Sequence, residues 1–571
     1  MTTFFESKVM HVFAKKILGC LIVASLNMIP SSPSLAQTQA DNAAMKKAQE
    51  YYKAGDVARL DKRYADAVQM LLKAYELIPE SSDLPYNIAC LHALRGAKED
   101  AFKWLDVAIG AGYLNVDHML KDSDFDSLHD DPRWQKSVDK TRQEAARQAR
   151  LWSSPVWDSA YVEQLSEDER VAGLSKFWSE VKYNFVYTDK LLDLDWDVVY
   201  LRYLPKVRAA KSTAEYYKIL MEMCALLQDG HTNVMAPAIL YNDVWGTVPL
   251  RAALMEDKVI ITDVLDPALR ERGILPGHQI LLADGQDIKT YVQKTVAPYN
   301  SASTPQDMDN RLYNYLLLLG DLDTPVKILV ADPQGKTLSI DIKRINTATR
   351  QKLATPRPAF NWRMLANNVA YVELNSFGDN TAAKEYIKAY AEIAKAKAII
   401  FDVRKNGGGD TNVGYSVLRT LGTPAFDGSH AATRDYKPAL RAWGKKQAMH
   451  DFADNKNQAD PARAYRGTVM VLTSAATYSA AEDFAVAFDS MKRGLIIGEP
   501  TGGSTGQPLM ISMPGGGSAR ICTKKDTYID GKAFVGVGVQ PGKLIHTKID
   551  DFRAGKDTQL NAALAEIEKI K

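Results

Sequence analysis

The sequence predicts a multidomain α+β protein in which helical repeats precede a β-rich segment and an α/β core. Three observations predict this class. Apolar residues recur with a 34-residue period near the N-terminus, short β-branched runs separated by Gly and Pro fill the middle, and strand, turn and helix patterns alternate after residue 365. The chain of 571 residues is long enough for several domains.

The composition excludes several classes of protein. Hydrophobic residues make up 46% and charged residues 25%, as in soluble globular proteins rather than disordered or wholly membrane-embedded ones. A net charge of +2 without a basic block predicts no nucleic-acid partner. Cys90, Cys224 and Cys522 are expected to be buried free thiols rather than a disulfide scaffold. No pattern predicts a metal or a cofactor.

Residues 1–36 have the three parts of a secretory signal peptide. Lys15 and Lys16 precede a short apolar run, and small residues lead to a cleavage site after Ala36. The run is shorter than the roughly 20 residues of a membrane span, so no stable span is expected after cleavage. The mature protein is expected to be periplasmic or secreted. Cleavage would remove three lysines and one glutamate, and with them the net positive charge.

Residues 41–150 resemble tetratricopeptide repeats. Ala67 and Ala101, like Leu71 and Leu105, are 34 residues apart, the period of a helix–turn–helix unit. Such repeats either hold a protein partner in a groove or act as a structural cap, and the sequence leaves both open. In the same region Asp122, Asp124 and Asp126 imitate the start of a calcium loop, but Ser127 and Arg133 replace its glycine and glutamate, so no calcium site is predicted. 

Residues 155–235 have helical periodicity and are expected to form a helical cap. The run ends at residues 228–232, QDGHT, which predict a turn into a strand. His231 lies in this turn, where its side chain can face a cleft.

Residues 240–345 consist of short strands with Gly and Pro turns and resemble a PDZ domain. The usual Gly-Asp of that domain is here Gly277-His278. PDZ domains add an extended peptide to the edge of a sheet. An ordinary small β domain is the alternative interpretation.

Residues 360–550 are expected to form the α/β core, followed by a C-terminal helix over 551–571. In the core, a buried strand over 397–404 opens into the glycines 407–409, whose N–H groups can form an oxyanion hole or simply a tight turn. A second strand leads to Ser479 at the start of a helix. There Ser479 is either a nucleophile or an N-cap paired with Glu482.

Two further segments of the core match known motifs but lack a feature that each motif requires. Residues 502–506 match the nucleophile elbow G-x-S-x-G, yet an alternating strand pattern follows where a helix is required. Residues 498–504 imitate a phosphate loop, but Ser504 stands where its lysine is needed.

Five motifs in order resemble the C-terminal processing (tail-specific) and tricorn-core serine peptidases. They are residues 228–232, 402–409, 478–482, 498–503 and 536–542, and the resemblance spans roughly 155–550. It implies a crotonase-like core in which Ser479 attacks the peptide carbonyl and the N–H groups of Ala480 and Gly408 hold the oxyanion.

The two branches of the family differ in their general base. The processing branch uses a lysine in a T-x-G-K-G segment, where this chain has Ser504, whereas the tricorn branch uses a histidine matched by His231. That branch also has a serine before the histidine, here Gly230, and an orienting glutamate that this chain lacks. Asp229, Asp526 and Asp530 are the candidates to replace this glutamate, and the sequence does not choose among them.

The sequence therefore supports two hypotheses. The first is an exported serine endopeptidase, with Ser479 as nucleophile and His231 as base, that cleaves extended or unfolded polypeptides and uses no metal or cofactor. The second is a catalytically weak or inactive peptide-binding scaffold on the same fold, whose repeats hold a protein partner. Binding of an apolar small molecule is a third alternative.

Overall fold

The computed structural model describes residues 35–423, 425–452 and 456–570, with side chains from residue 44 onward. The predicted signal segment lies outside the described residues except for Leu35 and Ala36, which begin the first described helix. Among these residues no helix combines the length and apolarity that a membrane span requires. The chain divides into two compact units, residues 1–152 and 153–571.

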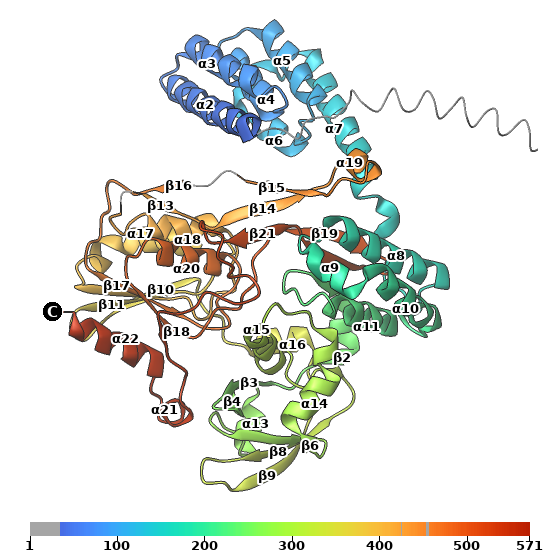
Figure 1. Ribbon diagram of the computed structural model, residues 1–571, viewed down its shortest axis with the longest axis vertical. Coiled ribbons are helices and arrows are strands. Elements are labelled where there is room, and N and C mark those ends of the chain that lie inside the picture. Colours follow the sequence, from blue (N-terminus) through green and yellow to red (C-terminus); the bar gives the residue numbers. More distant parts are fainter. Residues whose placement is uncertain (1–34, 424, 453–455, 571) are drawn as a thin grey trace, which may run out of the picture. The chain divides into compact units, whose positions relative to one another are not determined.

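The first unit is helical, and its helices pair as successive hairpins (blue in Figure 1). The residues at the 34-residue period are buried in the same way: Ala67 and Ala101 are both fully buried, and Leu71 and Leu105 nearly so. Its elements are α2 (Leu35–Leu60), α3 (Tyr64–Leu77), α4 (Asp83–Leu94), α5 (Lys98–Gly110), α6 (Val116–Lys121), η1 (Ser123–Leu128) and α7 (Pro132–Trp152).

The second unit begins with a helical region. Its elements are η2 (Pro155–Trp157), α8 (Glu167–Asn184), α9 (Thr188–Leu194), α10 (Trp196–Ala209), α11 (Thr213–Ala225), β1 (Asn233–Met235) and α12 (Ala238–Asp243). β1 pairs with β20 (Gly517–Cys522), and β20 with β19 (Pro508–Met513). The helices bury their apolar faces against these two late strands, through Ile511, Met513 and Ile521 among others.

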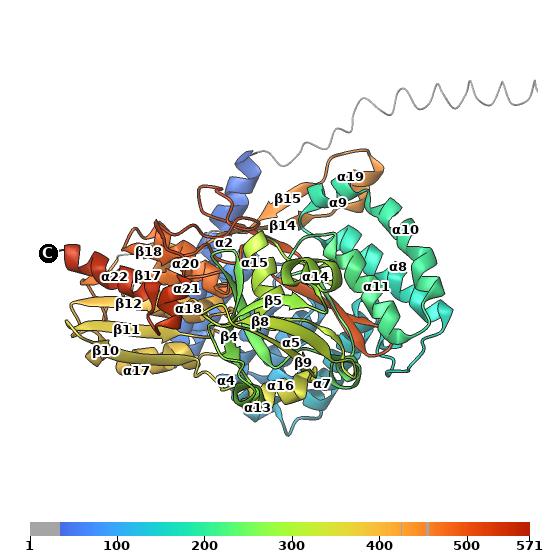
Figure 2. The ribbon, with the colours of Figure 1, turned by 90° about the horizontal axis from the view of Figure 1, so that it is seen from below.

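A β-rich insert follows, built on an antiparallel sheet in the order β3-β4-β5-β8-β9 (Figure 2). β3 is an edge strand of this sheet. The strands are β2 (Trp245–Gly246), β3 (Leu250–Met255), β4 (Lys258–Val264), β5 (Gln279–Ala283), β6 (Gln286–Asp287), β7 (Gly320–Asp321), β8 (Val326–Ala331) and β9 (Thr337–Ile342). The helices are α13 (Pro267–Glu271), α14 (Ile288–Thr295), η3 (Ala297–Tyr299), α15 (Pro305–Asp309), the π-helix η4 (Asn310–Tyr315) and α16 (Thr347–Leu353).

The core is a six-stranded sheet in the order β10-β11-β12-β17-β18-β22. β10 (Phe360–Leu365) is antiparallel to β11 (Val369–Leu374), and the remaining strands are parallel: β12 (Ala398–Asp402), β17 (Thr468–Thr473), β18 (Leu495–Gly498) and β22 (Lys543–Leu544). Successive residues of a strand point to opposite faces, so Phe401 and Val471 pack beneath one set of helices and Ile400 and Met470 beneath another.

The first face of this sheet is covered by α17 (Thr381–Ile393), α18 (Thr411–Leu418) and α20 (Ala480–Ser490), and the second by α22 (Thr558–Lys569) (Figure 1). α21 (Ile549–Arg553) precedes α22, and Gly555 (φ +68°) separates the two. The remaining elements are β13 (Ala425–Asp427), β14 (His430–Asp435), α19 (Pro438–Ala442), β15 (Ala448–Asp451), β16 (Lys456–Gln458) and β21 (Lys524–Thr527).

Candidate active site

Three neighbouring parallel strands deliver three segments to the same edge of the core sheet. β12 leads to the glycine loop at 406–409, β17 to Ser479, and β18 to the loop at 501–504. Because parallel strands carry their carboxyl ends on one edge, these segments meet although they are distant in sequence.

Ser479 lies in a strained turn between β17 and α20. Its φ of 56° and ψ of −126° are unusual for a residue with a side chain, and such conformations persist where the surrounding structure enforces them. The backbone N–H is held at 3.1 Å from the carbonyl oxygen of Ser504 and 3.2 Å from Oε2 of Glu482. The turn fixes the hydroxyl at the N-terminus of α20, where the helix dipole favours negative charge.

His231 reaches this hydroxyl from the helical region. Its Nε2 lies 3.1 Å from Ser479 Oγ, although the two residues are 248 positions apart. On the other side of the ring, Nδ1 lies 2.8 Å from Ser504 Oγ. The imidazole also stacks on Tyr478, with ring centroids 5.2 Å apart and planes only 6° from parallel. The sequence-predicted pair Ser479 and His231 therefore lies in direct contact.

The environment keeps the imidazole neutral. Burial lowers the pKa of His231 to about 3, and the positive charges of Arg520, Arg311 and Lys524 act in the same direction. A neutral imidazole has a free lone pair, which a general base needs to accept a proton.

Glu482 ties the nucleophile helix to the loop at 501–504. Its fully buried carboxylate accepts hydrogen bonds from the backbone N–H groups of Gly503 (2.7 Å) and Ser504 (2.8 Å) and from the hydroxyl of Thr501 (2.6 Å). Burial raises the pKa of Glu482 to about 8 against the effect of these donors. The sequence predicted Glu482 only as a helix-capping residue. In the structure it also binds the loop at 501–504.

Of the two expected oxyanion donors, the Ala480 N–H has no helical acceptor, whereas the Gly408 N–H already makes a hydrogen bond. Ala480 is the first residue of α20, and its N–H lies in the first turn, where no helical carbonyl is available. Gly408 packs against Ser479 so closely that a Cβ on it would lie 2.7 Å from Ser479 Cβ. Its N–H, however, donates to Oδ1 of the buried Asn406 at 2.9 Å. An oxyanion at Gly408 would have to share or displace this bond.

The three aspartates considered as orienting groups do not reach the imidazole ring in this structure. Asp229 is buried, and its carboxylate accepts a hydrogen bond from Thr232 Oγ1 at 2.6 Å. Asp526 is buried 2.9 Å from the ammonium group of Lys524. Asp530 is exposed. The residue that contacts Nδ1 is Ser504, which sequence reasoning had noted only as a departure from the lysine of the processing branch.

A cleft of about 820 Å³ lies between the insert and the core, and Ser479, His231 and Gly408 are not among the residues that line it. It is bounded by the edge strand β3, by Tyr315 of η4 and by the core loop that contains Ala475 and Ala476. The backbone of an edge strand can pair with an extended chain, so the cleft can hold a peptide next to the segment that leads to Ser479.

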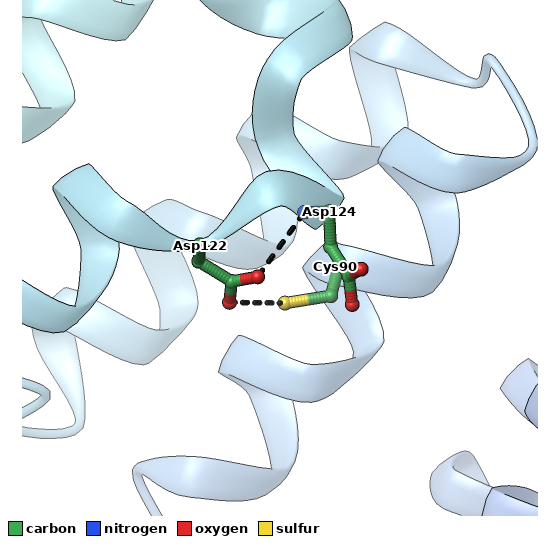
Figure 3. A group of neighbouring side chains, drawn as sticks. All are labelled: Cys90, Asp122 and Asp124. Atoms are coloured by element: carbon green, nitrogen blue, oxygen red, sulfur yellow. Dashed lines mark hydrogen bonds between the residues drawn. The ribbon is translucent and has the colours of Figure 1, made fainter.

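Within the described residues, cysteine and acidic side chains also gather in the first unit (Figure 3). Ligand atoms of Cys90, Asp122 and Asp124 lie within 4.8 Å of one another. The carboxylate of Asp122 already accepts hydrogen bonds from Tyr86 Oη (2.9 Å), Cys90 Sγ (3.6 Å) and the N–H of Asp124 (3.1 Å). Burial raises the pKa of the Cys90 thiol, and a thiol that keeps its proton is a poor metal ligand. The cluster fits a hydrogen-bonded anchor better than a metal site.

All three predicted thiols, Cys90, Cys224 and Cys522, are free and buried.

Comparison with known proteins identifies two regions of the chain. Residues 368–543 match Peptidase family S41, and residues 167–225 match the Tricorn protease C1 domain. The first region contains Ser479, Gly408 and Ser504. The second lies in the helical region and ends shortly before His231.

Two curated relatives are named as a peptidase and a protease, and each is similar to this chain at low sequence identity. The chloroplastic C-terminal processing peptidase of Tetradesmus obliquus is 24% identical over 369 residues, which cover 60% of this chain and 69% of that protein. The tail-specific protease of Haemophilus influenzae is 24% identical over 363 residues, which cover 60% of this chain. The chain spans about half (47%) of that second relative.

Solved structures share the fold. The crystal structure of mature CPAF has a TM-score of 0.54 at 14% identity and covers 68% of this chain and 94% of that one. The complex of mature CPAF with lactacystin gives 0.55 at 14% identity, covering 71% and 98%. The resemblances of residues 41–150 to tetratricopeptide repeats and of residues 240–345 to a PDZ domain stay predictions.

Proposed function

From the peptidase family S41 and tricorn C1 regions that this chain contains, we propose that it is a serine endopeptidase that acts through an acyl-enzyme on Ser479. The observation that carries the proposal is the 3.1 Å contact between Ser479 Oγ and His231 Nε2. A nucleophilic serine needs a base at this distance, because its hydroxyl is a weak nucleophile on its own.

The first half of the reaction is acylation. His231 Nε2 takes the hydroxyl proton while Ser479 Oγ bonds to the scissile carbonyl carbon, whose oxygen becomes negative. The N–H of Ala480, with that of Gly408 once released from Asn406, donates to this oxygen. His231 then returns the proton to the leaving amine as the C–N bond breaks. In deacylation a water molecule takes the place of the serine, and His231 again transfers the proton.

The cleft between the insert and the core supports a proposal for the substrate class. We infer that an extended or unfolded polypeptide lies along β3 and enters the site between the insert and the core. Strand addition recognises backbone rather than charge. Export through the predicted signal at 1–36 would place the enzyme in the periplasm or outside the cell, and the repeats at 41–150 would hold a protein partner.

The labelling of Ser479 tests the proposal. A fluorophosphonate probe should modify the purified wild-type chain at Ser479, identified by peptide mass spectrometry, and should not modify Ser479→Ala. His231→Ala should reduce the labelling rate by about 10²–10⁴-fold, the usual contribution of a general base. Ser416→Ala, which removes a half-buried hydroxyl on α18 that donates to the carbonyl oxygen of Asn412, is the matched control and should label like the wild type. Equal labelling of wild type and Ser479→Ala would exclude the assignment.

Two observations favour the alternative of a weak or inactive peptide-binding scaffold. The N–H of Gly408 is bound to Asn406, and none of the three candidate aspartates contacts the imidazole ring of His231. If the wild type takes no probe but binds an unfolded polypeptide in the cleft, as measured by fluorescence anisotropy, the scaffold is the function.

A further inference from the structure

The imidazole of His231 is held between two serine hydroxyls, Ser479 Oγ at Nε2 and Ser504 Oγ at Nδ1. In a neutral imidazole one nitrogen carries the proton and the other accepts. A nucleophilic Ser479 must donate to Nε2, so the ring proton belongs on Nδ1 and is donated to Ser504 Oγ. We propose, on the basis of the function proposed above, that Ser504 is the positioning residue that selects this tautomer and fixes the ring of His231.

The backbone of Ser504 is anchored to the nucleophile on both sides. Its N–H donates to Oε2 of Glu482 at 2.8 Å, and its carbonyl oxygen accepts the N–H of Ser479 at 3.1 Å. Ser504 is also fully buried, so water does not compete for its hydroxyl. These bonds fix the position of Ser504 Oγ relative to Ser479. A residue that positions the base needs such an anchor.

The hydroxyl of Ser504 has a partner of its own. The Tyr478 hydroxyl is hydrogen-bonded to the Ser504 side chain, and it accepts a hydrogen bond from Nη2 of Arg311 at 2.8 Å. The Tyr478 ring also stacks on His231. Tyr478 therefore fixes the plane of the imidazole, and Ser504 fixes its Nδ1. In the proposed tautomer the Ser504 hydroxyl donates its own proton to Tyr478 Oη, and an oxygen lone pair of Ser504 faces Nδ1–H.

A hydroxyl can orient the ring but cannot offset its positive charge as a carboxylate would. The charged side chains that act on His231 are mainly cationic: Arg311 from η4, Arg520 from β20 and Lys524 from β21. Asp307 pairs with Arg311 at 2.8 Å, and Lys524 pairs with Asp526. Asp229, on the same turn as His231, is buried against Thr232, and Glu482 is turned toward the 501–504 loop. Ser504 therefore acts through orientation, and its loss should change the rate without shifting the pH dependence of the base.

The test compares Ser504→Ala, Ser504→Thr and the control Thr505→Ala in the full chain. Thr505 is the next residue, is equally buried, and donates its hydroxyl to Asp526 rather than to His231. Two quantities are measured: the rate of fluorophosphonate labelling across pH, and the tautomer of His231 from ¹⁵N shifts of labelled histidine, assigned by loss of the signal in His231→Asn.

The expected results separate positioning from simple packing. Ser504→Ala should label at least about tenfold more slowly, in line with losses seen when a catalytic histidine loses its orienting partner, with an unchanged pH midpoint and without the Nδ1–H tautomer. Ser504→Thr keeps the hydroxyl and should keep the tautomer, and Thr505→Ala should keep both tautomer and rate. Wild-type rate and Nδ1–H tautomer in Ser504→Ala would overturn the proposal. So would loss of the tautomer in Thr505→Ala.

The two proposals fail in different ways. If the wild type is not labelled at all, the peptidase assignment fails, while the tautomer in Ser504→Ala and Ser504→Thr still decides whether Ser504 positions His231. If Ser504→Ala does not fold, Ser504→Thr and Thr505→Ala decide the matter by the tautomer alone: Nδ1–H in both supports the proposal, and its absence from Ser504→Thr contradicts it.

Discussion

The carboxylate of Glu482, one turn into α20, accepts the backbone N–H of Ser504 at 2.8 Å. This bond connects the helix that carries Ser479 to the loop that contacts His231 Nδ1. The relative position of the two serines consequently depends on this buried acid as well as on the direct bond from Ser479 N–H to the Ser504 carbonyl oxygen.

The first prediction concerns the effect of pH on stability through Glu482. Burial raises its pKa to about 8, whereas a glutamate in an unfolded chain titrates near about 4.3. Between about pH 4.3 and about pH 8, the folded protein keeps a proton on Glu482 that the unfolded chain releases. The contribution of Glu482 to the free energy of unfolding is therefore largest at low pH and falls as the pH rises toward 8. The difference in Tm between wild type and Glu482→Gln should therefore fall from pH 5 to pH 9. A difference that does not vary with pH would contradict this assignment.

The second prediction concerns the glycine loop. In Gly408→Ala the new Cβ would lie 2.7 Å from Ser479 Cβ and from the carbonyl oxygen of Tyr478, in a backbone with φ of +95°. Labelling of Ser479 should fall by about 10²-fold or more, the loss typical of a damaged oxyanion hole. Gly407→Ala is the control, because its Cβ would have no atom within 4 Å, and it should label normally. Similar rates for both variants would exclude a role for Gly408 at the site.

The third prediction concerns Gly230, the residue before His231. A Cβ at Gly230 would lie 1.9 Å from the Tyr478 hydroxyl. Gly230→Ser, which restores the serine of the tricorn branch, should lower stability by about 1–3 kcal/mol through overpacking. Tyr478→Phe removes the obstructing oxygen, so the double variant should recover part of the loss. A double-mutant cycle by thermal denaturation measures this coupling; strict additivity would show that the two positions do not compete for space.

The fourth prediction concerns the buried ion pairs of Arg404, just beyond β12. Its Nη2 donates to Asp402 at 2.6 Å and to Asp557 at 2.7 Å, and so joins the end of β12 to the start of α22. Arg404→Ala leaves Asp402 buried without its partner and should cost about 3–5 kcal/mol of stability. Lys492→Ala breaks the exposed pair with Asp489 and should cost less than about 1 kcal/mol. Equal losses in chemical denaturation would contradict the structural role of Arg404.

Much of the site could be predicted from the sequence. Ser479 after a buried strand and His231 in a turn were each ambiguous alone, and the order of the motifs brought them together as a pair. The 34-residue period likewise predicted which alanines and leucines are buried in the first unit.

The contact of Ser504 with His231 could not be predicted in this way. It depends on the neighbouring positions of β17 and β18 in the sheet and on the bonds of Glu482 to the 501–504 loop. Neither leaves a periodic signal in the chain. The G-x-S-x-G match at 502–506 failed as an elbow, yet its serine lies at the site for this different reason. The hydrogen bond between Gly408 and Asn406 was hidden for the same reason, since spacing gives the place of a backbone N–H but not its partner.

The pairing of β1 with β20 has a consequence for the biosynthesis of the protein. The turn that carries His231 is held by a strand at residues 517–522, so a ribosome must complete more than nine-tenths of the chain before the base can settle beside Ser479. A nascent chain that has reached Ser479 already contains His231, but it still lacks the strand that holds the His231 turn in place. Under the proposed function, the order of synthesis keeps the site incomplete until almost the whole chain has been made.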